Sequence, residues 1–597
     1  MTEITRTFDL LTYAEAHFPK EIALAVKRND RWESFSTADF RKHVDEFSLG
    51  LLAMGFEKGD KIATISNNRP EWNFIDFGMS QIGCVHVGIY PTISDNDYLH
   101  ILAHSDSKII IVSSEEMYTK IKPLFDQTPS LKEIYTIDEV KGVKNWNEIK
   151  ALGVKREDEL RPVLTERKKA VDPEDLLTLI YTSGTTGLSK GVMLTHRNVV
   201  SNFLLAHQFV TYLNPGDRAL SFLPLSHVLE RVGNYLWQSK GLSIYYAENI
   251  ETIGKNMSEI KANTFITVPR VFEKVYDKII NKGRELTGAK KAIFFWAVKV
   301  ADKYDPNPKN RSLVYNMKLA LANKLVFSKW REALGGELKG VISGGAALQP
   351  RLARIFWAAK IFVQEGFGLT EMSPIVSATN SFYPQVKFGS TGIVPIGIDV
   401  KIAEDGEILC KGENLMKGYY KEPELTAEAI DKDGWFHTGD IGEIDENRML
   451  RITDRKKEIF KLSGGKYVAP QVVENKFKES QFIDQLIVIG ENERFTGALI
   501  VPDFIFLHNW CSLHKVKYVD NVDLVRHPKV IARYEKEVEK YNAEFEKVAQ
   551  IKVFKLICES WTPESGDLSP TQKLKRKPIM AKYNHLIEEI YRGDQNN

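Results

Sequence analysis

The sequence is poor in cysteine and has no long hydrophobic run. Its four cysteines, Cys84, Cys410, Cys511 and Cys558, lie far apart and form no C-x-x-C pair. This spacing argues against a zinc site or a disulfide framework and favours a reducing compartment. No apolar stretch approaches the roughly 20 residues that a membrane-spanning helix needs, and the N-terminus lacks the basic and apolar regions of a signal peptide. We therefore expect a cytoplasmic protein whose contact with a membrane, on its inner face, is at most peripheral.

The sequence also lacks an excess of charge of either sign. It holds 81 lysines and arginines against 79 aspartates and glutamates over 597 residues, which gives no support to bulk nucleic-acid binding. Residues 271–335 depart from this balance, with fourteen basic and six acidic residues, and include the apolar stretch AIFFWAV (Ala292–Val298). A basic helix with aromatic residues can contact anionic lipid. The alternative is an amphipathic helix whose basic face is solvated.

Apolar strands alternate with amphipathic helices from about residue 60. KIATIS, CVHVGIY, KIIIVSS and EIYTID are typical of strands, and the segment after the first has Trp72, Ile75, Met79 and Ile82 on one helical face. The pattern returns with ALSFL, LSIYYA, TFITVP and GVISGG. Such alternation predicts parallel sheets covered by helices on both faces. We expect an α/β protein whose large N-terminal domain contains two doubly wound subdomains.

The pattern changes at about residue 385. Short strands and glycine turns in STGIVPIGIDVKIAEDGEILCKGENLM predict a small β-rich subdomain. A charged break, TDRKKE, contains Asp454. Beyond it, a helix from Pro470, strands in QLIVIG and GALIVPD, a helix over about 530–548 and the strand KVFKLIC predict a smaller α+β domain. We therefore divide the chain into an N-terminal domain, residues 1–453, and a mobile C-terminal domain, residues 454–597.

The most informative short segment is YTSGTTGLSKG, residues 181–191. A P-loop would require glycine at position 189, where serine stands. An esterase elbow, G-x-S-x-G, matches residues 187–191, but its strand should run directly into the first glycine, and the apolar strand LLTLIY ends at Tyr181. Glycines allow backbone N–H groups to surround an anion, while hydroxyl groups and Lys190 add donors and charge. We predict a phosphate-binding loop rather than a flexible linker.

Six further motifs follow this loop in the chain. They are LPLSHVLER (Leu223–Arg231), ISGGAAL (Ile342–Leu348), EGFGLTE (Glu365–Glu371), GWFHTGD (Gly434–Asp440), DRKKEIFKLSGGKYVAP (Asp454–Pro470) and LSPTQKLKR (Leu568–Arg576). Together with the loop, they resemble the adenylate-forming superfamily of AMP-dependent synthetases and ligases over nearly the whole chain. NNRPEW near the start, SPTQKLKR and the long C-terminal domain look most like long-chain fatty-acid–CoA ligases.

The resemblance implies roles for individual residues. Lys573 is expected to be catalytic, reaching the α-phosphate and the carboxylate during adenylation, where charge stabilisation matters more than covalent help. Glu371, also expected to be catalytic, and Thr182 belong on the metal side, since Mg²⁺ prefers oxygen ligands. Asp454 corresponds to the family's hinge residue. The implied ATP- and AMP-binding residues are Thr182, Ser183, Gly184, Thr185, Thr186, Gly187, Lys190, Gly344, Gly345, Ala346, Glu365, Gly366, Phe367, Gly368, Thr370, Asp440, Arg455 and Lys457.

Gly464 and Gly465 correspond to family positions that contact the CoA arm. His227, in PLSH, matches a family position at the carboxylate end of the acyl pocket, which would make it catalytic, whereas a lone histidine is more often structural. Phe367 stands where the family usually has a tyrosine stacked on adenine, and phenylalanine keeps that stacking face. By itself, it would be interpreted as a core aromatic.

Two polar candidates have simpler interpretations as well. Asp440 can accept hydrogen bonds from both ribose hydroxyls, but it also follows Gly439 as a turn residue would. The segment TQKLKRK, which contains Lys573, would by itself be typical of a solvated basic tail.

The predicted reaction is ATP-dependent activation of a long-chain fatty acid to acyl-CoA through an acyl-adenylate, with release of pyrophosphate and AMP. Mg²⁺, ATP and CoA are the expected cofactor and cosubstrates, and no nucleic acid takes part. The nearest alternative is a fatty acyl-AMP ligase that loads a carrier protein; in that branch an insertion after the hinge motif hinders rotation, and none is evident here. A luciferase-like enzyme, a nucleotide sensor without turnover and an ATP-independent esterase are the others. The sequence leaves open the acyl chain length and the choice between monomer and homodimer.

Overall fold

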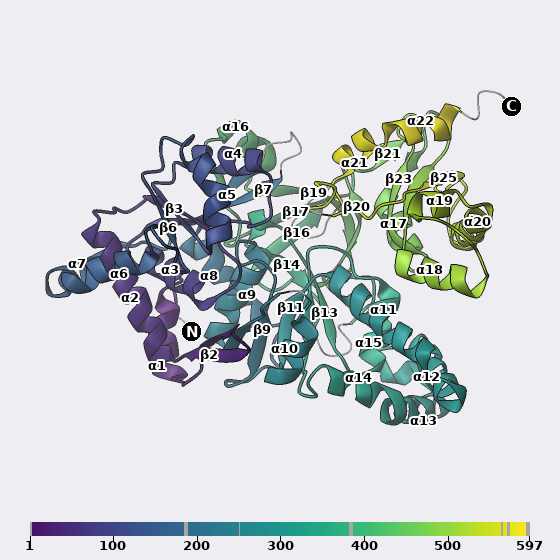
Figure 1. Ribbon diagram of the computed structural model, residues 1–597, viewed down its shortest axis with the longest axis horizontal. Helices are drawn as coiled ribbons and strands as arrows, with labels where there is room; N and C mark the ends of the chain where they lie inside the picture. The colour runs from purple at the N-terminus through teal and green to yellow at the C-terminus, as the bar shows by residue number, and fades with distance from the viewer. Residues whose placement is uncertain are drawn as a thin grey trace. The chain divides into compact units, whose positions relative to one another are not determined.

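A computed structural model describes residues 3–183, 189–249, 251–380, 386–562, 565–569 and 574–592, with only the backbone described at Ser183. The chain forms two compact units (Figure 1). The first comprises Met1–Leu348, Leu352–Val400 and Cys410–Phe436, and the second Gln349–Arg351, Lys401–Leu409 and His437–Asn597. The boundary at 453/454 was predicted as a hinge, and it stays a prediction.

One sheet of the first unit has the strand order β18-β8-β7-β4-β3-β5-β6. The strands β7, β4, β3, β5 and β6 run parallel to one another. β8 is antiparallel to β7, and β18 is antiparallel to β8. Its strands are β3 (Lys61–Ile65), β4 (Val85–Ile89), β5 (Ile109–Val112), β6 (Glu133–Thr136), β7 (Leu176–Ser183), β8 (Ser189–Thr195) and β18 (Gly418–Tyr419). β4 and β5 are buried along their whole length, because helices cover both faces of the sheet.

A second run of strands in the first unit has the order β15-β14-β13-β12-β11-β9-β10-β1-β2. From β1 to β13 it is parallel, and β2, β14 and β15 are antiparallel additions. The strands are β1 (Leu24–Arg28), β2 (Arg31–Phe35), β9 (Arg218–Ser221), β10 (Ser243–Tyr246), β11 (Thr264–Thr267), β12 (Val341–Ser343), β13 (Val363–Gly368), β14 (Ile375–Ala378) and β15 (Gly392–Ile393). The predicted pair of doubly wound α/β subdomains is confirmed.

Helices connect most of these strands. They are α1 (Asp9–His17), α2 (Thr37–Ala53), α3 (Pro70–Gln81), α4 (Asp95–Ser105), α5 (Glu115–Phe125), α6 (Trp146–Lys155), α7 (Glu157–Ala170), α8 (His196–Ala206), α9 (Val228–Ser239), α10 (Ile253–Ile260), α11 (Pro269–Glu285), α12 (Gly288–Ala301), α13 (Leu313–Ala322), α14 (Ser328–Ala333), α15 (Pro350–Ala358) and α16 (Pro423–Ala429). Short η turns cover Pro308–Asn310, Asn323–Phe327 and Thr370–Met372. Within the described part of the chain, no helix is long and apolar enough to cross a membrane.

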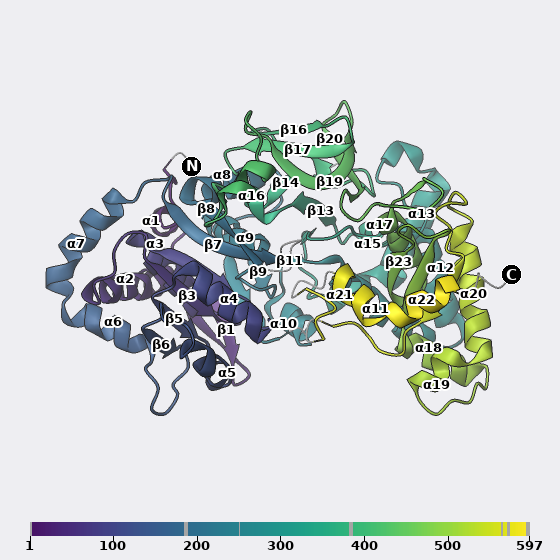
Figure 2. The same ribbon diagram turned by 90° about the horizontal axis from the view of Figure 1, so that it is seen from above.

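The helix α3 departs from the amphipathic pattern expected of it. Every residue from Pro70 to Gln81 is buried, including those opposite the face of Trp72 and Met79. The reason lies in the neighbouring helices, since α2 packs on α3 and is itself tied to α7 through Asp45, which pairs with Arg161 at 2.8 Å and Lys168 at 3.1 Å. Figure 2 shows α2, α6 and α7 side by side at this end of the unit.

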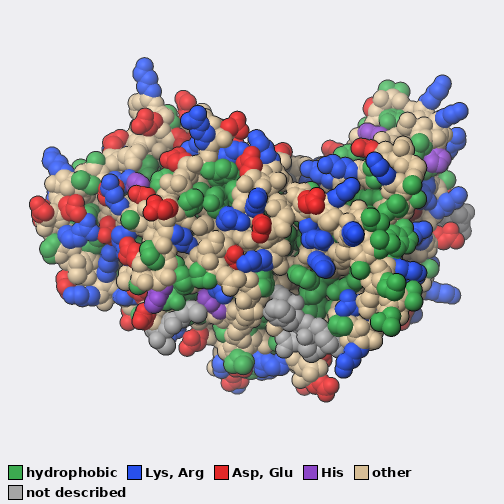
Figure 3. Space-filling view, turned by 90° about the horizontal axis from the view of Figure 1, so that it is seen from below, with side chains coloured by type: hydrophobic (Ala, Val, Ile, Leu, Met, Phe, Trp, Pro, Cys, Tyr) green, Lys and Arg blue, Asp and Glu red, His purple; other side chains and the backbone are tan. Residues whose placement is uncertain are grey.

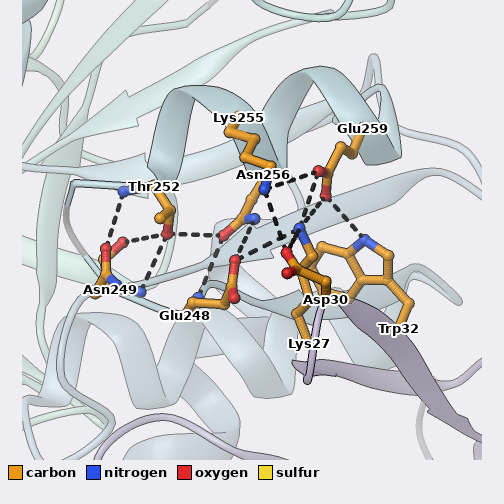
Figure 4. Close-up of polar contacts among 9 residues, drawn as sticks. All are labelled: Lys27, Asp30, Trp32, Glu248, Asn249, Thr252, Lys255, Asn256 and Glu259. Carbon is orange, nitrogen blue, oxygen red and sulfur yellow. Dashed lines mark hydrogen bonds and ion pairs between the residues drawn. The ribbon is translucent and has the colours of Figure 1, made fainter.

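The β1–β2 hairpin joins the second run of strands through a charged cluster. Lys27 of β1 is 2% exposed at its side chain, and its ammonium lies 2.9 Å from both carboxylate oxygens of Glu259 and 3.6 Å from Glu248 (Figure 4). Trp32 of β2 donates its indole N–H to Glu259 at 3.3 Å. These contacts attach the hairpin to α10, because a desolvated ammonium needs carboxylate partners.

The second unit is an α+β unit, as predicted. It takes in parts of β16 (Ile398–Ile402), β17 (Glu407–Gly412) and β19 (Phe436–Ile444), all of β20 (Met449–Arg455), and the two-stranded pair β21 (Phe460–Lys461) and β22 (Tyr467–Val468). Its three-stranded sheet contains β23 (Ile483–Ile489), β24 (Gly497–Pro502) and β25 (Val553–Leu556). The helices are α17 (Pro470–Phe477), α18 (Phe504–Leu513), α19 (Asn521–Arg526), α20 (Pro528–Asn542), α21 (Arg576–Lys582) and α22 (Asn584–Arg592). α20 ends earlier than the helix predicted over about 530–548.

Candidate active site

The strands on either side of the predicted phosphate loop form a hydrogen-bonded pair. In the antiparallel register of β7 and β8, Thr182 lies opposite Lys190, and Ser183 opposite Ser189. Ser189 therefore lies in a strand and not in the strand-to-helix turn of an esterase elbow, so that alternative is wrong. The loop residues themselves, Gly184, Thr185, Thr186 and Gly187, lie outside the described residues.

Tyr419 connects the lysine of this loop to the predicted metal-side carboxylate. Its hydroxyl donates to Glu371 Oε1 at 2.9 Å, and Lys190 Nζ lies 4.1 Å from the centre of its ring. Tyr419 is 5% exposed, and burial, reinforced by the Glu371 carboxylate, raises its pKa. The hydroxyl therefore stays protonated and remains a donor to the carboxylate. One buried ring thus holds a cation on its face and an anion at its edge.

The position of Tyr419 depends on the short strand β18. Tyr419 pairs with Val192 of β8, and the next residue, Tyr420, donates its backbone N–H to Gly191 at 2.8 Å. On the other side, the backbone N–H of Met416 donates to the carbonyl of Glu371 at 2.7 Å. The segment 416–420 therefore ties the lysine-bearing strand to the turn that carries Glu371. Sequence analysis missed Tyr419, because no local pattern indicates a strand of two residues.

Two buried asparagines hold the turn that follows Glu371. Asn414 donates to the carbonyls of Met372 and Ile375 at 2.6 and 3.0 Å. Asn202 of α8 donates to the same two carbonyls at 3.2 and 3.1 Å. The two amide groups thus satisfy the backbone carbonyls at both ends of the segment 372–375 and hold the turn that carries Glu371. Neither asparagine stood out in the sequence.

The predicted adenine-side residues lie at the carboxyl ends of two neighbouring parallel strands. Ser343 of β12 is opposite Glu365 of β13, so the segments Gly344–Ala346 and Gly366–Gly368 follow at the same edge, where ligands bind in sheets of this kind. Gly345 has φ +82°, and a Cβ on Gly368 would lie 2.1 Å from the carbonyl oxygen of Pro374. Both positions therefore require glycine.

The side chains at this edge are mostly buried. Phe367 is 9% exposed, which is compatible with a stacking face and with a core aromatic alike. Burial raises the pKa of Glu365 to about 8. Thr370 begins the turn that carries Glu371 and is buried, whereas Ala346 is exposed. The structure thus brings Thr370 and Glu371 next to the end of β13.

His227 has a structural role in the described contacts. It is the N-cap of α9, and its Nδ1 accepts the backbone N–H of Leu229 at 3.2 Å. Its ring lies 6.4 Å from that of Tyr90. This capping satisfies one of the free N–H groups at the helix start. A role for His227 at the acyl carboxylate stays a prediction.

The two charged residues after His227 are buried in different surroundings. Arg231 donates to Thr178 Oγ1 at 2.6 Å and pairs with Asp76, which also accepts from His86 at 2.7 Å. Although burial acts in the opposite direction, the Arg231 guanidinium lowers the pKa of Asp76 to about 2. No cation lies beside Glu230 among the residues that the structure describes; its carboxylate accepts from Asn234 at 3.4 Å and also bonds with Ser221. Burial raises the pKa of Glu230 to about 8.

In the second unit, Asp440 and Arg455 are brought together by strand pairing. They lie opposite each other in β19 and β20, and Arg455 Nε donates to Asp440 Oδ1 at 3.1 Å. Asp440 is buried, whereas the Arg455 side chain is half exposed. A carboxylate fixed by an arginine at the surface of a sheet can accept hydrogen bonds from a pair of vicinal hydroxyls.

Glu407 supports the turn that carries Asp440. Its carboxylate accepts the backbone N–H of Gly439 at 2.9 Å, His437 Nδ1 at 3.2 Å and Lys456 Nζ at 2.8 Å. Burial opposes ionisation, but Lys456 lowers the pKa of Glu407. Glu407, which sequence analysis did not identify, therefore fixes the backbone next to Asp440. Lys457, which was predicted to bind nucleotide, is exposed next to this cluster.

Asp454, the predicted hinge, is buried at the end of β20. Its Oδ1 accepts the backbone N–H of Arg455 at 2.6 Å, and burial raises its pKa to about 7. Gly464 and Gly465 form the exposed turn between β21 and β22, where Gly465 has φ +81°. A Cβ on Gly464 would meet no atom within 4 Å, so nothing in the fold itself requires that glycine.

Lys573 lies outside the described residues, but both flanks of its motif are anchored. Leu568 and Leu574 form an antiparallel bridge. Arg576 donates to Glu474 Oε1 at 2.5 Å and to the carbonyl of Val488. Glu474 Oε1 also accepts the backbone N–H of Val488 at 2.8 Å. Because Arg576 is bonded to α17 and β23 and is only partly exposed, the basic run is not a solvated tail from Leu574 onward.

The donors in the first unit fit a magnesium ion. Among the described residues, no three histidine, cysteine or acidic side chains cluster as a closed metal site. Glu371 would supply one carboxylate and Thr182 a hydroxyl, and Mg²⁺ is typically held by one or two carboxylates with phosphate and water. Oxygen donors close to Lys190 are therefore suited to a metal that arrives with a phosphate ligand.

Comparison with known proteins identifies the family. Residues 11–420 match the AMP-binding enzyme family, and residues 457–595 match the C-terminal domain of AMP-binding enzymes. The chain belongs to this family of adenylate-forming enzymes. It is 33% identical to long-chain-fatty-acid–CoA ligase FadD15 of Mycobacterium bovis, over 94% of this chain and 92% of the relative. It is 32% identical to long-chain-fatty-acid–CoA ligase 5 of Rattus norvegicus, over 94% and 84%.

Solved structures share the fold. The adenylation domain of the carboxylate reductase of Mycobacterium chelonae matches with a TM-score of 0.75 at 21% identity, covering 98% of this chain and 91% of that domain. An anthranilate CoA ligase in complex with anthranoyl-AMP matches with a TM-score of 0.70 at 16% identity, covering 97% of each chain. At identities this low, the comparison shows that the fold is shared and nothing more.

Two of the buried carboxylates of the first unit, Glu230 and Glu71, are expected to affect stability in opposite ways as the pH changes. We expect the free energy of unfolding of the wild type to fall between pH 5 and pH 8.5 relative to that of Glu230→Gln, which lacks this titrating group. The folded-state pKa of Glu230, about 8, lies above the unfolded value, so the stabilisation is complete below the unfolded pKa and is lost as pH rises through the folded one. Urea-unfolding midpoints at several pH values measure this.

The matched control is Glu71→Gln. Glu71 is also buried, but Arg28 and Arg69 contact it at 2.5 and 2.9 Å, and its pKa is lowered despite burial. This variant should be less stable than the wild type at both pH 5 and pH 8.5, because the ion pairs are formed above the unfolded pKa. Equal pH dependence of the wild type and Glu230→Gln would contradict a neutral Glu230.

Proposed function

We propose that this chain is a long-chain fatty-acid–CoA ligase. It activates a long-chain fatty acid with ATP to an acyl-adenylate and transfers the acyl group to CoA, releasing pyrophosphate and AMP. The observation that supports the adenylation step is the contact of Lys190 and Glu371 with one buried ring, that of Tyr419. We assign phosphate binding to Lys190 and metal binding to Glu371. The relatives named long-chain-fatty-acid–CoA ligases, which align over nearly the whole chain, support the substrate class.

In the first half-reaction, a carboxylate oxygen of the fatty acid attacks the α-phosphorus of ATP. The new O–P bond forms as the bond to pyrophosphate breaks, and no protein nucleophile is needed. Lys190 and the glycine loop hold the β- and γ-phosphates, and Phe367 stacks on adenine. Asp440 and Arg455 bind the ribose. Lys573 stabilises the charge that develops around the α-phosphate and the acid.

Thr182 and Glu371 are the residues that would hold Mg²⁺. The bound ion supplies charge neutralisation for the phosphates. Tyr419 keeps Glu371 in place with a charge-assisted hydrogen bond, and Lys190 stays on the face of the same ring until phosphate is available. These residues therefore orient the two charged ends of the triphosphate site before the nucleotide binds.

In the second half-reaction, the CoA thiol attacks the acyl carbon of the adenylate and AMP leaves. The C-terminal unit turns about Asp454, Lys573 withdraws, and Gly464 and Gly465 approach the CoA arm. The chain continues from Asp454 through β21 and β22 to Pro470 without an inserted domain, which supports CoA rather than a carrier protein as the acceptor. We also propose that the chain works in the cytoplasm and contacts the membrane only peripherally.

Pyrophosphate release with Mg·ATP and fatty acids of increasing length tests the proposal. We expect release that depends on long-chain acids and reaches repeated turnover only when CoA is present. A single burst that CoA does not change would support the acyl-AMP ligase alternative, and no release with any acid would leave only a nucleotide sensor. Light emission with oxygen would indicate a luciferase-like enzyme.

The role of Lys573 is tested by separating the half-reactions. Lys573→Ala should lower pyrophosphate release by a factor of about 100 or more, since it removes a charge that stabilises the transition state. Thioester formation from supplied acyl-adenylate and CoA should remain close to that of the wild type. Equal losses in both half-reactions would show that Lys573 has a different role.

The role of Tyr419 is tested by removing its hydroxyl alone. In Tyr419→Phe the ring under Lys190 remains, but Glu371 loses a charge-assisted hydrogen bond. We expect a rise of about tenfold in the Mg·ATP concentration needed for half-maximal pyrophosphate release. Tyr420→Phe is the matched control, because the Tyr420 hydroxyl donates to a different carboxylate, Asp106, at 3.0 Å. If both variants behave alike, Tyr419 does not position the metal-side residue.

A further inference from the structure

Helix α13 carries an exposed apolar stripe on the surface of the first unit. Leu313 is 84% exposed and Met317 73%, and Val314 and Leu321 are also exposed. Leu313, Met317 and Leu321 are spaced four residues apart, so they lie along one face of the helix. Leu325, in the wide π turn Asn323–Phe327 that continues α13, is exposed as well. Monomeric proteins rarely leave so many large apolar side chains together in water.

The opposite face of α13 is firmly packed, so the exposure is not a sign of a loose helix. Leu319, Ala322, Val326 and Phe327 are buried in the core that also contains Trp330. Asn323 donates to the carbonyls of Leu319 and Ala358 at 3.1 and 3.0 Å. Tyr315 donates its hydroxyl to the carbonyl of Val300 at 3.0 Å and thereby ties α13 to α12.

The charges around this stripe are of one sign. Residues 309–331 contain six basic and no acidic residues, and the basic residues are Lys309, Arg311, Lys318, Lys324, Lys329 and Arg331. Lys318, Lys324 and Lys329 are exposed, and their side chains have no ion-pair partner among the residues that the structure describes. Three exposed lysines therefore lie on the same segment as the stripe. Figure 3 views the molecule from the side on which α13 and α14 lie in Figure 1, and hydrophobic side chains are visible among lysines and arginines on this face.

The aromatic stretch of α12 is excluded as the contact surface. Phe294, Ala297 and Val298 are buried in the same core, and Phe295 and Trp296 pack against it. Of AIFFWAV, only Ala292 and Ile293 are exposed. This stretch therefore offers little apolar surface to a bilayer, whereas its neighbour α13 is exposed.

We propose that α13 and the π turn after it form a surface that docks on an anionic lipid bilayer. Leu313, Val314, Met317, Leu321 and Leu325 enter the interface between headgroups and acyl chains, while Lys318, Lys324 and Lys329 contact lipid phosphates. An amphipathic helix with an apolar face and basic flanks binds lipid in this way. The absence of any acidic residue over this stretch favours a lipid phosphate surface over a second copy of the chain, whose same face would be equally basic. Docking assigns a surface to the peripheral membrane contact proposed above and does not depend on the ligase activity; delivery of a fatty acid from the bilayer would rest on both.

Flotation of the full chain with vesicles tests the proposal without ATP, CoA or fatty acid, so failure here and failure of the proposed function are distinguishable. We expect binding to phosphatidylcholine vesicles that contain about one third phosphatidylglycerol, and weaker binding to phosphatidylcholine alone or at high salt. The triple variant Leu313→Ser, Met317→Ser, Leu321→Ser should lower the partition coefficient by at least about tenfold. Each of Lys318→Gln, Lys324→Gln and Lys329→Gln should lower it by about fivefold at low salt.

The matched control is the triple variant Ile505→Ser, Leu513→Ser, Val519→Ser. These three side chains of the second unit are as exposed as those of α13, so the control loses equal apolar character at another surface and should bind as the wild type does. All substituted side chains are exposed, and unchanged unfolding midpoints would verify the folds.

A local probe identifies the element that enters the lipid. An environment-sensitive fluorophore on Met317→Cys, in a Cys558→Ser background because the other three cysteines are buried, should shift to shorter wavelength with anionic vesicles. The same label on Leu513→Cys should not shift. No binding of the wild type, equal binding of the α13 variant, or a dimer that this variant dissociates would each overturn the proposal.

Discussion

Tyr419 lies between Lys190 and Glu371, and the predicted triphosphate site depends on this one buried ring. Lysine and glutamate brought close together at the end of a sheet would otherwise form a direct ion pair, which would occupy the groups that phosphate and magnesium need. The ring separates them: the ammonium rests on its face, and the hydroxyl occupies one carboxylate oxygen. Both charged groups are thereby oriented by the same ring.

Hydrogen bonds to the neighbouring backbone hold Tyr419 and the turn of Glu371 in place. The two-residue strand β18 fixes Tyr419 beside β8, Met416 holds the carbonyl of Glu371, and Asn202 and Asn414 satisfy the turn behind it. In the second unit, Glu407 accepts the backbone N–H of Gly439 and thereby holds the turn next to Asp440. In each case, a residue with no expected ligand contact supports the backbone at a carboxylate that is expected to bind a ligand.

The buried acidic residues Asp76, Glu71, Glu230 and Glu365 of the first unit fall into two groups. Asp76 and Glu71 have arginines beside them and keep lowered pKa values. Glu230 and Glu365 have no such partner in the described part of the chain, and their pKa values are raised to about 8. The same desolvation acts on all four, so the presence of a cation decides the charge. Glu365 lies on β13, directly before the glycines that the nucleotide is expected to approach. A neutral side chain there avoids repulsion of the phosphates.

The sequence by itself determined the two parallel sheets, the loop between β7 and β8, the α+β nature of the C-terminal unit and the family, since strand alternation and short motifs are local patterns. Only the tertiary structure decided which residues meet. Lys190 and Tyr419 are more than two hundred residues apart, α3 is buried on all sides because α2 covers it, and His227 caps a helix. The helix with the aromatic stretch faces the core, while its neighbour α13 faces solvent. Periodicity indicates that a helix has an apolar face but not what covers it, because that depends on strand order and on helices brought in from elsewhere in the chain.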